Sequence, residues 1–261
     1  MIKILGDKII RDSKVFVIKI GKYVFKIPLS RFAREEIREE HFIMQKVKDD
    51  EHFSKFLFNY KYYFFNIQCS PYFVSLLELK KKDDLMSGYF NYSFKDFNKW
   101  KKIELKKIIE LDYFFNFIKK YFKTDYELWS SFVSKIKMPL SSAHGDFYPD
   151  NILVGDDDKL FFIDWIRYNY FSSRYFDLFD YYIFSRKEKK VSWIEFFKIE
   201  YESGKEKLLG VNINKDYFLS YGIWKMSKEI KMLEKRKKMT EQKTKKYLNF
   251  IKYLSKIIYE N

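Results

Sequence analysis

The chain has 261 residues, of which 47% are hydrophobic, and its formal net charge at pH 7 is +15. This length and apolar content suffice for a sizeable core and for two lobes, and the low counts of 8 glycines and 4 prolines exclude a linker-rich or disordered chain. The positive charge favours anionic partners such as nucleotides, nucleic acid or an anionic membrane surface, although a lysine-rich, solvent-exposed surface accounts for it at least as well.

The first 28 residues are typical of three antiparallel strands. The stretch "KIIRDSKVFVIKIGKYVFKIP" contains β-branched and aromatic runs that are interrupted at Asp12-Ser13 and again at Gly21-Lys22. A glycine followed by one residue suits a tight two-residue hairpin turn. The sequence therefore predicts a meander, with Lys26 near the end of its third strand.

A helix is expected next, because Pro28-Leu29-Ser30 ends the strand and provides a helix cap. The residues that recur at helical spacing are Ala33, Ile37, Glu40, Met44 and Val47. A carboxylate on an otherwise apolar face needs a partner, since burying it unpaired is costly. Glu36, one helical turn from Glu40, competes with Glu40 for the role of the paired carboxylate, whereas Glu35 and Glu39 fall off the stripe.

The remainder of the chain is expected to complete a sheet and then to become mostly helical. Residues 56–67 and 72–79 are typical of two further strands, and the polar residues 80–88 are interpreted as a hinge. Helical periodicity covers residues 94–135 and resumes beyond residue 175. A terminal helix is predicted to pack on the C-terminal lobe through Tyr247, Phe250, Ile251, Leu254 and Ile258.

The segment "SSAHGDFYPDNILVGDDDKLFFIDWI", residues 141–166, brings acidic and amide side chains together on a polar loop and a predicted hairpin. Asp146 and Asn151 lie five apart on a loop with a proline between them, and a short hairpin would return Asp164 beside Asn151. Phosphoryl transfer needs a carboxylate at the acceptor hydroxyl and oxygen ligands for Mg²⁺. The joint pattern is more specific than either "HGD" or an Asp and an Asn five residues apart.

These motifs are similar to those of a known superfamily. "HGDFYPDNIL" resembles the catalytic loop, and "FFIDW" the metal-binding acid, of the aminoglycoside phosphotransferase and choline kinase superfamily, which are small-molecule relatives of protein kinases. The resemblance runs from about Val15 to Asp180. It implies a two-lobed α+β kinase-like fold, with a five-stranded N-terminal antiparallel sheet and one helix in residues 1–79 and a mostly helical lobe in residues 80–261.

The resemblance also implies roles for individual residues. Transfer of the γ-phosphate of ATP or GTP would use Asp146 as base, with Mg²⁺ held by Asn151 and Asp164. Lys26 would contact the α- and β-phosphates, and Glu40 would hold it in place. The first turn, "RDSK", lacks the glycine that is frequent in the family, so Ser13 and nearby amides would bind phosphate, and the adenine would dock against the backbone of about Glu78 and Leu79.

Neighbouring residues are assigned structural roles. His144 is expected to support the loop by a hydrogen bond, and Gly145 to meet a backbone constraint. Asp177 matches a structural aspartate of the family, and Asp180 is expected to share that role. The run Asp156–Asp158 is interpreted as a solvated hairpin tip.

The acceptor and two alternative functions stay open. A sugar, a cell-surface glycan precursor or a small alcohol such as choline is preferred, because the net charge of +15 disfavours cationic aminoglycosides. Choline would require an aromatic cage, for which Trp165, Trp193 and Trp224 are candidates, although core packing is the simpler use. The alternatives are an inactive nucleotide-binding regulatory module and a basic protein that binds nucleic acid or membranes.

Localisation and partners follow from what the sequence lacks. Cys69 is the single cysteine, which rules out an intramolecular disulfide, and no Cys/His cluster has zinc spacing. Charges interrupt the first ten residues, unlike a signal peptide, and no apolar run of about 18 residues is present. We expect a cytoplasmic protein without an obligatory protein partner. A protein kinase is disfavoured, because no extended activation segment follows Asp164.

Overall fold

The computed structural model describes residues 2–10, 13–57, 60–122, 126–186 and 191–260. The chain forms two compact units, each made of two segments: unit 1 comprises Met1–Met86 and His144–Asn169, and unit 2 comprises Ser87–Ala143 and Tyr170–Asn261. Among the described residues, no helix has the length and apolar content needed to cross a membrane. The motif segment from His144 onward therefore belongs to the same compact unit as the N-terminal strands.

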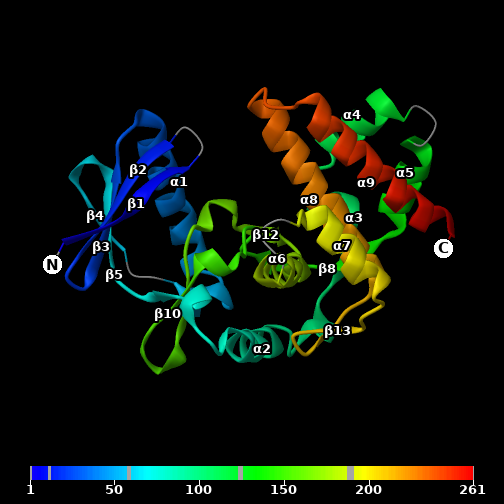
Figure 1. Ribbon diagram of the computed structural model, residues 1–261. Helices are drawn as coiled ribbons and strands as arrows, with labels where there is room; N and C mark the ends of the chain where they lie inside the picture. Colours follow the sequence, from blue (N-terminus) through cyan, green and yellow to red (C-terminus); the bar gives the residue numbers. More distant parts are fainter. Residues whose placement is uncertain (1, 11–12, 58–59, 123–125, 187–190, 261) are drawn as a thin grey trace. The chain divides into compact units, whose positions relative to one another are not determined.

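Unit 1 contains an antiparallel sheet with strand order β1-β2-β3-β5-β4, drawn in blue to cyan in Figure 1. The predicted meander is confirmed and consists of β1 (Ile2–Ile10), β2 (Ser13–Ile20) and β3 (Tyr23–Pro28). Gly21, at a φ of +59°, and Lys22 form the two-residue turn between β2 and β3. Such a turn matches the right-handed twist of the strands and favours glycine.

The last strands of this sheet do not lie where the sequence predicted them. β4 (Lys61–Tyr63) falls inside the predicted strand 56–67, but β5 (Ile67–Pro71) begins only at its last residue. A 3₁₀ turn, Phe64–Asn66, separates the two strands, and Asn66 has a φ of +58°. Of the predicted strand 72–79, only β6 (Val74–Ser75) is extended and paired, with β10 in a second sheet. Aromatic-rich composition conceals the turn, because its side chains also suit a strand.

Helix α1 (Arg31–Lys48) confirms the predicted cap and stripe. The Ser30 hydroxyl accepts a hydrogen bond from the Ala33 backbone N–H at 3.1 Å and satisfies one of the unpaired donors of the first turn. The buried residues of the helix are the predicted ones: Ala33, Ile37, Glu40, Met44 and Val47. Glu40 therefore enters the interior of unit 1 in an otherwise apolar row.

The motif segment packs on the turn that follows this helix through a cluster of aromatic rings. The elements here are the 3₁₀ turn Phe53–Phe56 and the antiparallel strands β10 (Ile152–Val154) and β11 (Leu160–Phe162). The Phe53 ring lies 5.4 Å from the Trp165 ring and 6.4 Å from the Phe162 ring, all three being fully buried. The predicted hairpin is thus present, and its ends are fixed by the core of unit 1.

Unit 2 is mostly helical, as expected for the C-terminal part of the chain (Figure 1). The chain passes from unit 1 to unit 2 within α2. The helices are α2 (Lys82–Ser93), α3 (Leu105–Ile108), α4 (Asp112–Tyr121), α5 (Tyr126–Lys135), α6 (Arg174–Arg186), α7 (Trp193–Glu202), α8 (Lys215–Lys235) and α9 (Glu241–Glu260). Short strand pairs join them: β7 (Lys102–Glu104) with β8 (Lys137–Pro139), β9 (Ser141–Ala143) with β12 (Asn169–Ser172), and β13 (Lys207–Leu208) with β14 (Val211–Asn212).

Two predictions for this region are corrected. The polar segment interpreted as a hinge is helical from Lys82, because Asp83 and Asp84 occupy the favourable first turn and Met86 begins a buried face. The predicted helical stretch 94–135 is interrupted by β7, which pairs with β8. The periodicity of apolar residues cannot reveal a strand of three residues whose partner strand lies far along the chain.

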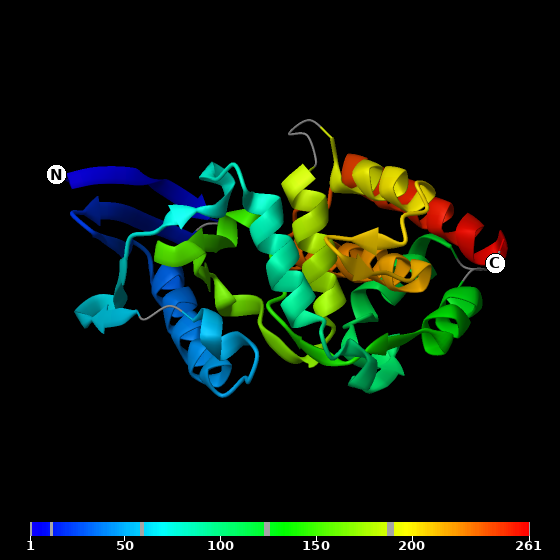
Figure 2. The ribbon, with the colours of Figure 1, turned by 90° about the horizontal axis from the view of Figure 1, so that it is seen from below.

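The C-terminal helix α9 packs on unit 2 as predicted. Tyr247, Phe250, Ile251 and Leu254 are buried, and Ser255 accepts a hydrogen bond from the Trp129 indole N–H at 3.1 Å. The Phe250 ring lies 5.4 Å from the ring of Trp193 on α7. Figure 2 shows α7 (yellow) beside α9 (red). The apolar stripe of the terminal helix is therefore used for packing.

Candidate functional site

The loop that begins the motif segment is fixed by His144. This residue is fully buried, its Nε2 lies 3.0 Å from the backbone carbonyl oxygen of Ile163, and its ring lies 4.5 Å from the Trp165 ring. The hydrogen bond connects the start of the loop to the residue before Asp164. The prediction that His144 supports the loop is thus confirmed.

Gly145 is required by both backbone conformation and space. Its φ is +79°, in the left-handed region, and a Cβ built at this position would overlap the carbonyl oxygen of Arg167. A side chain at this position would displace either the Asp146 loop or the turn after Asp164. The predicted backbone constraint is therefore present, and it brings these two segments into direct contact.

Asp146, Asn151 and Asp164 converge through the loop and the hairpin. The Asn151 side-chain amide donates a hydrogen bond of 2.8 Å to the backbone carbonyl of Asp146, and the Ile163 backbone N–H donates one of 3.0 Å to the carbonyl of Asn151. Asp164 adopts a left-handed conformation with φ 65° and ψ 54°, which aspartate tolerates better than most residues. This conformation turns the chain sharply at the end of β11 and carries the Asp164 carboxylate beside the loop.

Lys26 and Glu40 form the ion pair that the sequence predicted. The Lys26 Nζ lies 3.7 Å from Glu40 Oε2, and the Glu40 side chain is only 7% exposed. The other oxygen, Oε1, accepts a hydrogen bond of 3.2 Å from the backbone N–H of Asp164. The Glu40 carboxylate thereby connects β3 with the turn that carries Asp164. Glu36 is half-buried nearby but forms no described ion pair with Lys26.

These groups line one cavity of about 310 Å³ in unit 1. A volume near 300 Å³ is at the lower end of the range of small-molecule sites. The lining contains five carboxylates and two basic side chains, so the charge of this cavity is opposite to the net charge of the chain. The lining residues are Val15, Val17, Lys26, Glu36, Ile37, Glu40, Asp146, Tyr148, Asp150, Asn151, Ile163, Asp164, Ile166 and Arg167.

Arg167 is a cavity residue that the sequence reasoning missed. Its guanidinium Nη1 lies 3.4 Å from Asp146 Oδ1, and both side chains are largely buried. In the sequence, Arg167 stands out only by its position three residues after Asp164, and this spacing does not indicate that its partner is Asp146. In the structure it ends a 3₁₀ turn (Trp165–Arg167). Tyr148 and Asp150, from the same loop, also line the cavity.

The nearby Tyr60 was also missed. Burial raises the pKa of the Tyr60 phenol well above its usual range, and the carboxylate of Glu40, the Tyr62 phenol and the carboxylate of Asp164 raise it further. The Lys26 ammonium lies 6.0 Å from the centroid of the Tyr60 ring. A buried phenol therefore stands beside the ion pair.

The chemistry of the donor set fits Mg²⁺. Asn151 and Asp164 offer one amide and one carboxylate group to the same cavity. Because the Asn151 nitrogen donates to Asp146, the amide oxygen is turned away from that bond and is available as a ligand. The described residues contain no cluster of three His, Cys, Asp or Glu side chains that holds a metal unaided. Mg²⁺ does not need one, since it retains waters and phosphate oxygens.

The structure does not bring the residues predicted to bind the nucleotide base into the described lining of the cavity. The Ser13 backbone is the first residue of β2, but its side chain lies outside the described part of the chain, as do Arg11 and Asp12. Glu78 is exposed and ends a 3₁₀ turn (Leu76–Glu78), and the Leu79 backbone N–H donates to the Leu76 carbonyl at 3.1 Å. Neither Glu78 nor Leu79 belongs to the lining of the cavity, whereas Val15 and Val17 of β2 do.

The other aspartates considered in the sequence are either exposed at the hairpin tip or buried in unit 2. The hairpin tip Asp156–Asp158 is exposed, as predicted. Asp177 is fully buried in α6. Asp180, also fully buried, accepts hydrogen bonds from the Tyr221 hydroxyl at 2.7 Å and from the Lys225 ammonium at 2.8 Å. This buried pair within unit 2 supports the structural interpretation of Asp180.

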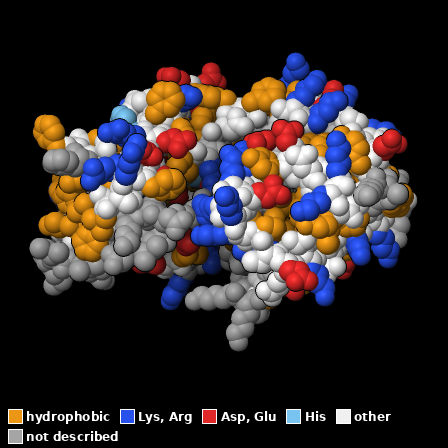
Figure 3. All heavy atoms as spheres, turned by 90° about the horizontal axis from the view of Figure 1, so that it is seen from above, with side chains coloured by type: hydrophobic (Ala, Val, Ile, Leu, Met, Phe, Trp, Pro, Cys, Tyr) orange, Lys and Arg blue, Asp and Glu red, His pale blue; other side chains and the backbone are white. Residues whose placement is uncertain are grey.

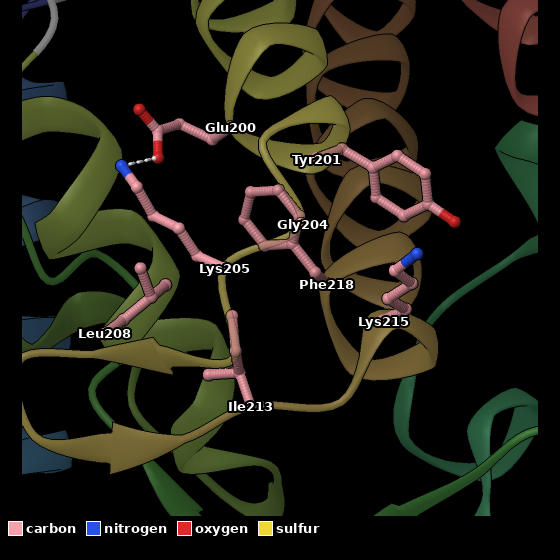
Figure 4. Close-up of a pocket in the computed structure, with 8 residues that line it drawn as sticks. All are labelled: Glu200, Tyr201, Gly204, Lys205, Leu208, Ile213, Lys215 and Phe218. Carbon is pink, nitrogen blue, oxygen red and sulfur yellow. Dashed lines mark hydrogen bonds and ion pairs between the residues drawn. The ribbon is translucent and has the colours of Figure 1, made fainter.

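Unit 2 has hollows of its own, but they lack this combination of groups. One, shown in Figure 4, lies between the end of α7 and the start of α8, and Glu200 pairs there with Lys205 at 2.7 Å. Its volume of about 10 Å³ is at the limit for a single water molecule. Another, of about 380 Å³, is lined by Phe117, Lys120, Tyr121, Glu234, Lys237 and Met239. On the face shown in Figure 3, Lys and Arg side chains are interspersed with acidic and hydrophobic ones.

Comparison with solved structures identifies the fold. The chain is similar to the choline kinase LicA from Streptococcus pneumoniae, with 14% identity, a TM-score of 0.53 and coverage of 98% of this chain and 93% of that one. It is also similar to a macrolide 2'-phosphotransferase type I, with 10% identity, a TM-score of 0.52 and coverage of 94% and 87%. The chain has the fold of the aminoglycoside phosphotransferase and choline kinase superfamily.

The likeness to this superfamily rests on the fold and on the motifs quoted above. No family model matches the sequence, and no curated protein matches it. The resemblance first indicated by "HGDFYPDNIL" and "FFIDW" is confirmed at the level of the fold. The residues that line the cavity of unit 1 have to support any more specific function.

Proposed function

We propose that the chain is a phosphotransferase that moves the γ-phosphate of ATP or GTP to a hydroxyl group of a small molecule, with Mg²⁺ as cofactor. The observation that carries the proposal is the convergence of Asp146, Asn151, Asp164 and the Lys26–Glu40 ion pair on one cavity of unit 1. Phosphoryl transfer requires positioning and charge neutralisation more than covalent chemistry, and these groups supply both.

The residues divide the work by their chemistry. Asn151 and Asp164 would hold Mg²⁺, which neutralises the charge that develops on the phosphates. Lys26, restrained by Glu40, would contact the α- and β-phosphates. Asp146 would orient the acceptor hydroxyl and take its proton. The 3.4 Å contact with Arg167 supports this role, because a neighbouring cation holds the Asp146 carboxylate in one orientation.

The lobes of the chain would share the reaction. We propose that residues 1–79 bind the nucleotide, with Ser13 and nearby amides at the phosphates and the backbone of Glu78 and Leu79 at the base. Residues 80–261 would contain the catalytic residues and bind the acceptor. The position of Val15 and Val17 in the cavity lining supports a nucleotide there, since apolar residues are suited to the flat faces of a base.

We propose as acceptor a sugar, a glycan precursor or a small alcohol such as choline. The net charge of the chain disfavoured cationic acceptors, but the cavity lining is acidic, so that argument does not apply to the cavity. Mg²⁺, Lys26 and Arg167 would neutralise part of the negative charge of the lining. The candidate tryptophans of a choline cage are engaged in packing. Trp165 and Trp193 are buried, and Trp224 stacks on Phe176 with the Lys228 ammonium 4.6 Å from its ring. A neutral hydroxyl acceptor is therefore preferred.

The experiment is an acceptor screen by mass spectrometry with the full chain, MgATP or MgGTP, and a panel of sugars and small alcohols. A mass increase of one phosphoryl group on an acceptor, absent with Asp146→Asn, is the expected result. Nucleotide binding without transfer to any acceptor would favour an inactive regulatory module instead. Tight, steeply salt-dependent binding of nucleic acid or anionic vesicles without nucleotide binding would favour a basic binding protein.

A further inference from the structure

The turn that follows Asp164 is tied to the end of α1 by a short hydrogen bond within unit 1. The Tyr168 hydroxyl donates to Asp50 Oδ2 at 2.6 Å, across 118 positions of the sequence. This distance lies within the roughly 2.5–2.7 Å of a charge-assisted O–H···O⁻ bond, which is about twice as strong as a bond between neutral groups. The contact is therefore a firm link between two distant segments.

Asp50 is itself held in place by the backbone around it. Its side chain is buried, and Oδ1 accepts hydrogen bonds of 2.8 Å from the backbone N–H groups of His52 and Phe53. The Asp50 backbone N–H donates to the carbonyl of Val47, in the last turn of α1, at 3.1 Å. The orientation of the carboxylate is thus defined, and Oδ2 offers Tyr168 an acceptor at a fixed point.

The turn is consequently held at both of its ends. At its start, the Asp164 backbone N–H donates to Glu40 Oε1 of α1 at 3.2 Å. At its end, the Tyr168 backbone N–H donates to the Trp165 carbonyl at 2.9 Å, while the Tyr168 hydroxyl is bound to Asp50. The two carboxylates that hold the turn come from α1 and from the residues directly after it, so both ends have the same support.

Arg167 is the residue of this turn that reaches the Asp146 loop. The distance of 3.4 Å between its Nη1 and Asp146 Oδ1 exceeds the roughly 2.7–2.9 Å of a charge-assisted N–H···O⁻ bond, so this contact alone does not fix the guanidinium. The position of the Arg167 backbone is set by its neighbour Tyr168. Neither Tyr168 nor Asp50 belongs to the described lining of the cavity, so both would affect the reaction only through Arg167.

We propose that the hydrogen bond between Tyr168 and Asp50 positions the Arg167 guanidinium against the Asp146 carboxylate. Asp50 provides a fixed point at the end of α1, Tyr168 holds the turn to that point, and Arg167 orients the proposed base. Tyr168 and Asp50 are therefore positioning residues. This inference rests on the proposed function, since Asp146 is the base of the proposed reaction.

The test begins with Tyr168→Phe, which removes the hydroxyl and retains the ring that lies 5.9 Å from the Phe53 ring and 6.0 Å from the Trp165 ring. The probe is MgATP with water as the phosphoryl acceptor, and release of inorganic phosphate by the full chain is measured. We expect kcat to fall about three- to tenfold, the effect of losing one hydrogen bond. The Kd of MgATP, measured by calorimetry, should stay unchanged, because Arg167 acts on the base and not on the proposed nucleotide-binding groups.

A double-mutant cycle tests whether Tyr168 acts through Arg167. In Arg167→Met the guanidinium is absent, and the addition of Tyr168→Phe should lower kcat by less than about twofold, because the group that Tyr168 positions is gone. A purely structural Tyr168 would lower kcat by the same factor in both backgrounds. The cycle therefore separates a positioning role from a general loss of packing.

Tyr247→Phe is the matched control. The Tyr247 hydroxyl donates to Glu229 Oε2, also at 2.6 Å, and joins α9 to α8 within unit 2. Tyr247→Phe thus removes a bond of the same kind and length away from the proposed site. It should lower the urea midpoint of unfolding much as Tyr168→Phe does, while kcat and the Kd of MgATP stay unchanged.

Asp50→Asn replaces Tyr168→Phe in the cycle if the latter does not fold. The asparagine oxygen can keep the two backbone hydrogen bonds, while its amide nitrogen faces the Tyr168 hydroxyl in place of the carboxylate oxygen. Its kcat should fall with the Kd of MgATP unchanged, and it should have no further effect in Arg167→Met.

Three results would overturn the inference and leave the proposed function intact: unchanged kcat in Tyr168→Phe, unchanged kcat in Arg167→Met, or equal losses in both backgrounds of the cycle. A wild-type chain that binds MgATP but transfers its γ-phosphate neither to water nor to any acceptor of the panel would overturn the inference together with the proposed function.

Discussion

The Arg167 guanidinium lies 3.4 Å from the Asp146 carboxylate, and the Arg167 backbone carbonyl occupies the space that a Cβ on Gly145 would need. The turn after Asp164 therefore contacts the loop that carries Asp146 twice, once through a charged side chain and once through the backbone. Since the loop carries the proposed base and the turn follows the proposed metal ligand, the two parts of the site are fixed against each other within unit 1.

The guanidinium contact can be tested by Arg167→Met, which keeps much of the side-chain volume and removes the charge. We expect phosphoryl transfer to fall about 10-fold or more, because Asp146 loses the cation that orients it. Arg167→Lys should recover only part of the rate, since lysine is a point charge without the planar fork of arginine. Steady-state rates of the three proteins with an acceptor from the screen give the comparison, and equal rates would show that Arg167 does not orient the base.

Gly145→Ala tests the backbone contact. The substitution places a Cβ against the Arg167 carbonyl at a left-handed φ of +79°, and we expect a loss of stability of about 3 kcal/mol or more. Gly21→Ala is the control, because Gly21 has a φ of +59° but no atom within 4 Å of the built Cβ. It should cost only the left-handed penalty of about 1–2 kcal/mol. Urea unfolding measures both, and equal losses would contradict the steric argument.

Asp164→Asn tests the proposed metal ligand without adding backbone strain, because asparagine also tolerates the left-handed conformation. MgATP affinity should fall by more than the ~10–100-fold expected for loss of an outer-shell partner of a metal. Adenosine affinity should be retained. Asp156→Asn, at the exposed hairpin tip, is the control and should change neither. Retention of Mg²⁺-dependent nucleotide binding by Asp164→Asn would remove this residue from the metal site.

In unit 2, the buried pair of Asp180 and Lys225 predicts a large effect on folding. Lys225→Met leaves the Asp180 carboxylate buried without its cation, and we expect a loss of about 3–5 kcal/mol in the free energy of unfolding. Lys231 pairs with Glu110 at the surface, so Lys231→Met should cost no more than about 1 kcal/mol. Thermal and urea unfolding of the two variants test this difference, and a small loss for Lys225→Met would mean that Asp180 is satisfied by Tyr221.

Local rules were sufficient for much of the N-terminal part of the site. The Ser30 cap, the apolar stripe of α1 and the Gly21 turn each follow from neighbouring residues, and they place Glu40 in the interior and Lys26 on its strand. The carboxylate in the stripe was the useful signal, because burying it demands a cation. The resemblance to the superfamily, and not a local rule, indicated that Lys26 is that cation.

Contacts between distant segments could not be predicted in the same way. The pairing of Arg167 with Asp146 and the approach of the Tyr60 ring to Lys26 depend on how the hairpin and the segment before β4 fold within unit 1. Strand boundaries failed for a related reason, since the 3₁₀ turn Phe64–Asn66 has the aromatic composition of a strand. Net charge was misleading about the cavity, because a surface average contains no information about which side chains converge.

Asp146→Asn separates the proposed base from the proposed metal ligands. Asparagine keeps the shape of the side chain but cannot accept the proton of the acceptor hydroxyl, and general-base assistance is worth about 10²–10⁴-fold. The backbone carbonyl of Asp146, which holds Asn151, is unaffected by the substitution. We therefore expect a large fall in kcat with a nucleotide Kd changed by less than about tenfold, or ~1.4 kcal/mol. Calorimetry beside a turnover assay measures both quantities. Lost nucleotide binding would make Asp146 a metal ligand, and unchanged turnover would place the chemistry outside this loop.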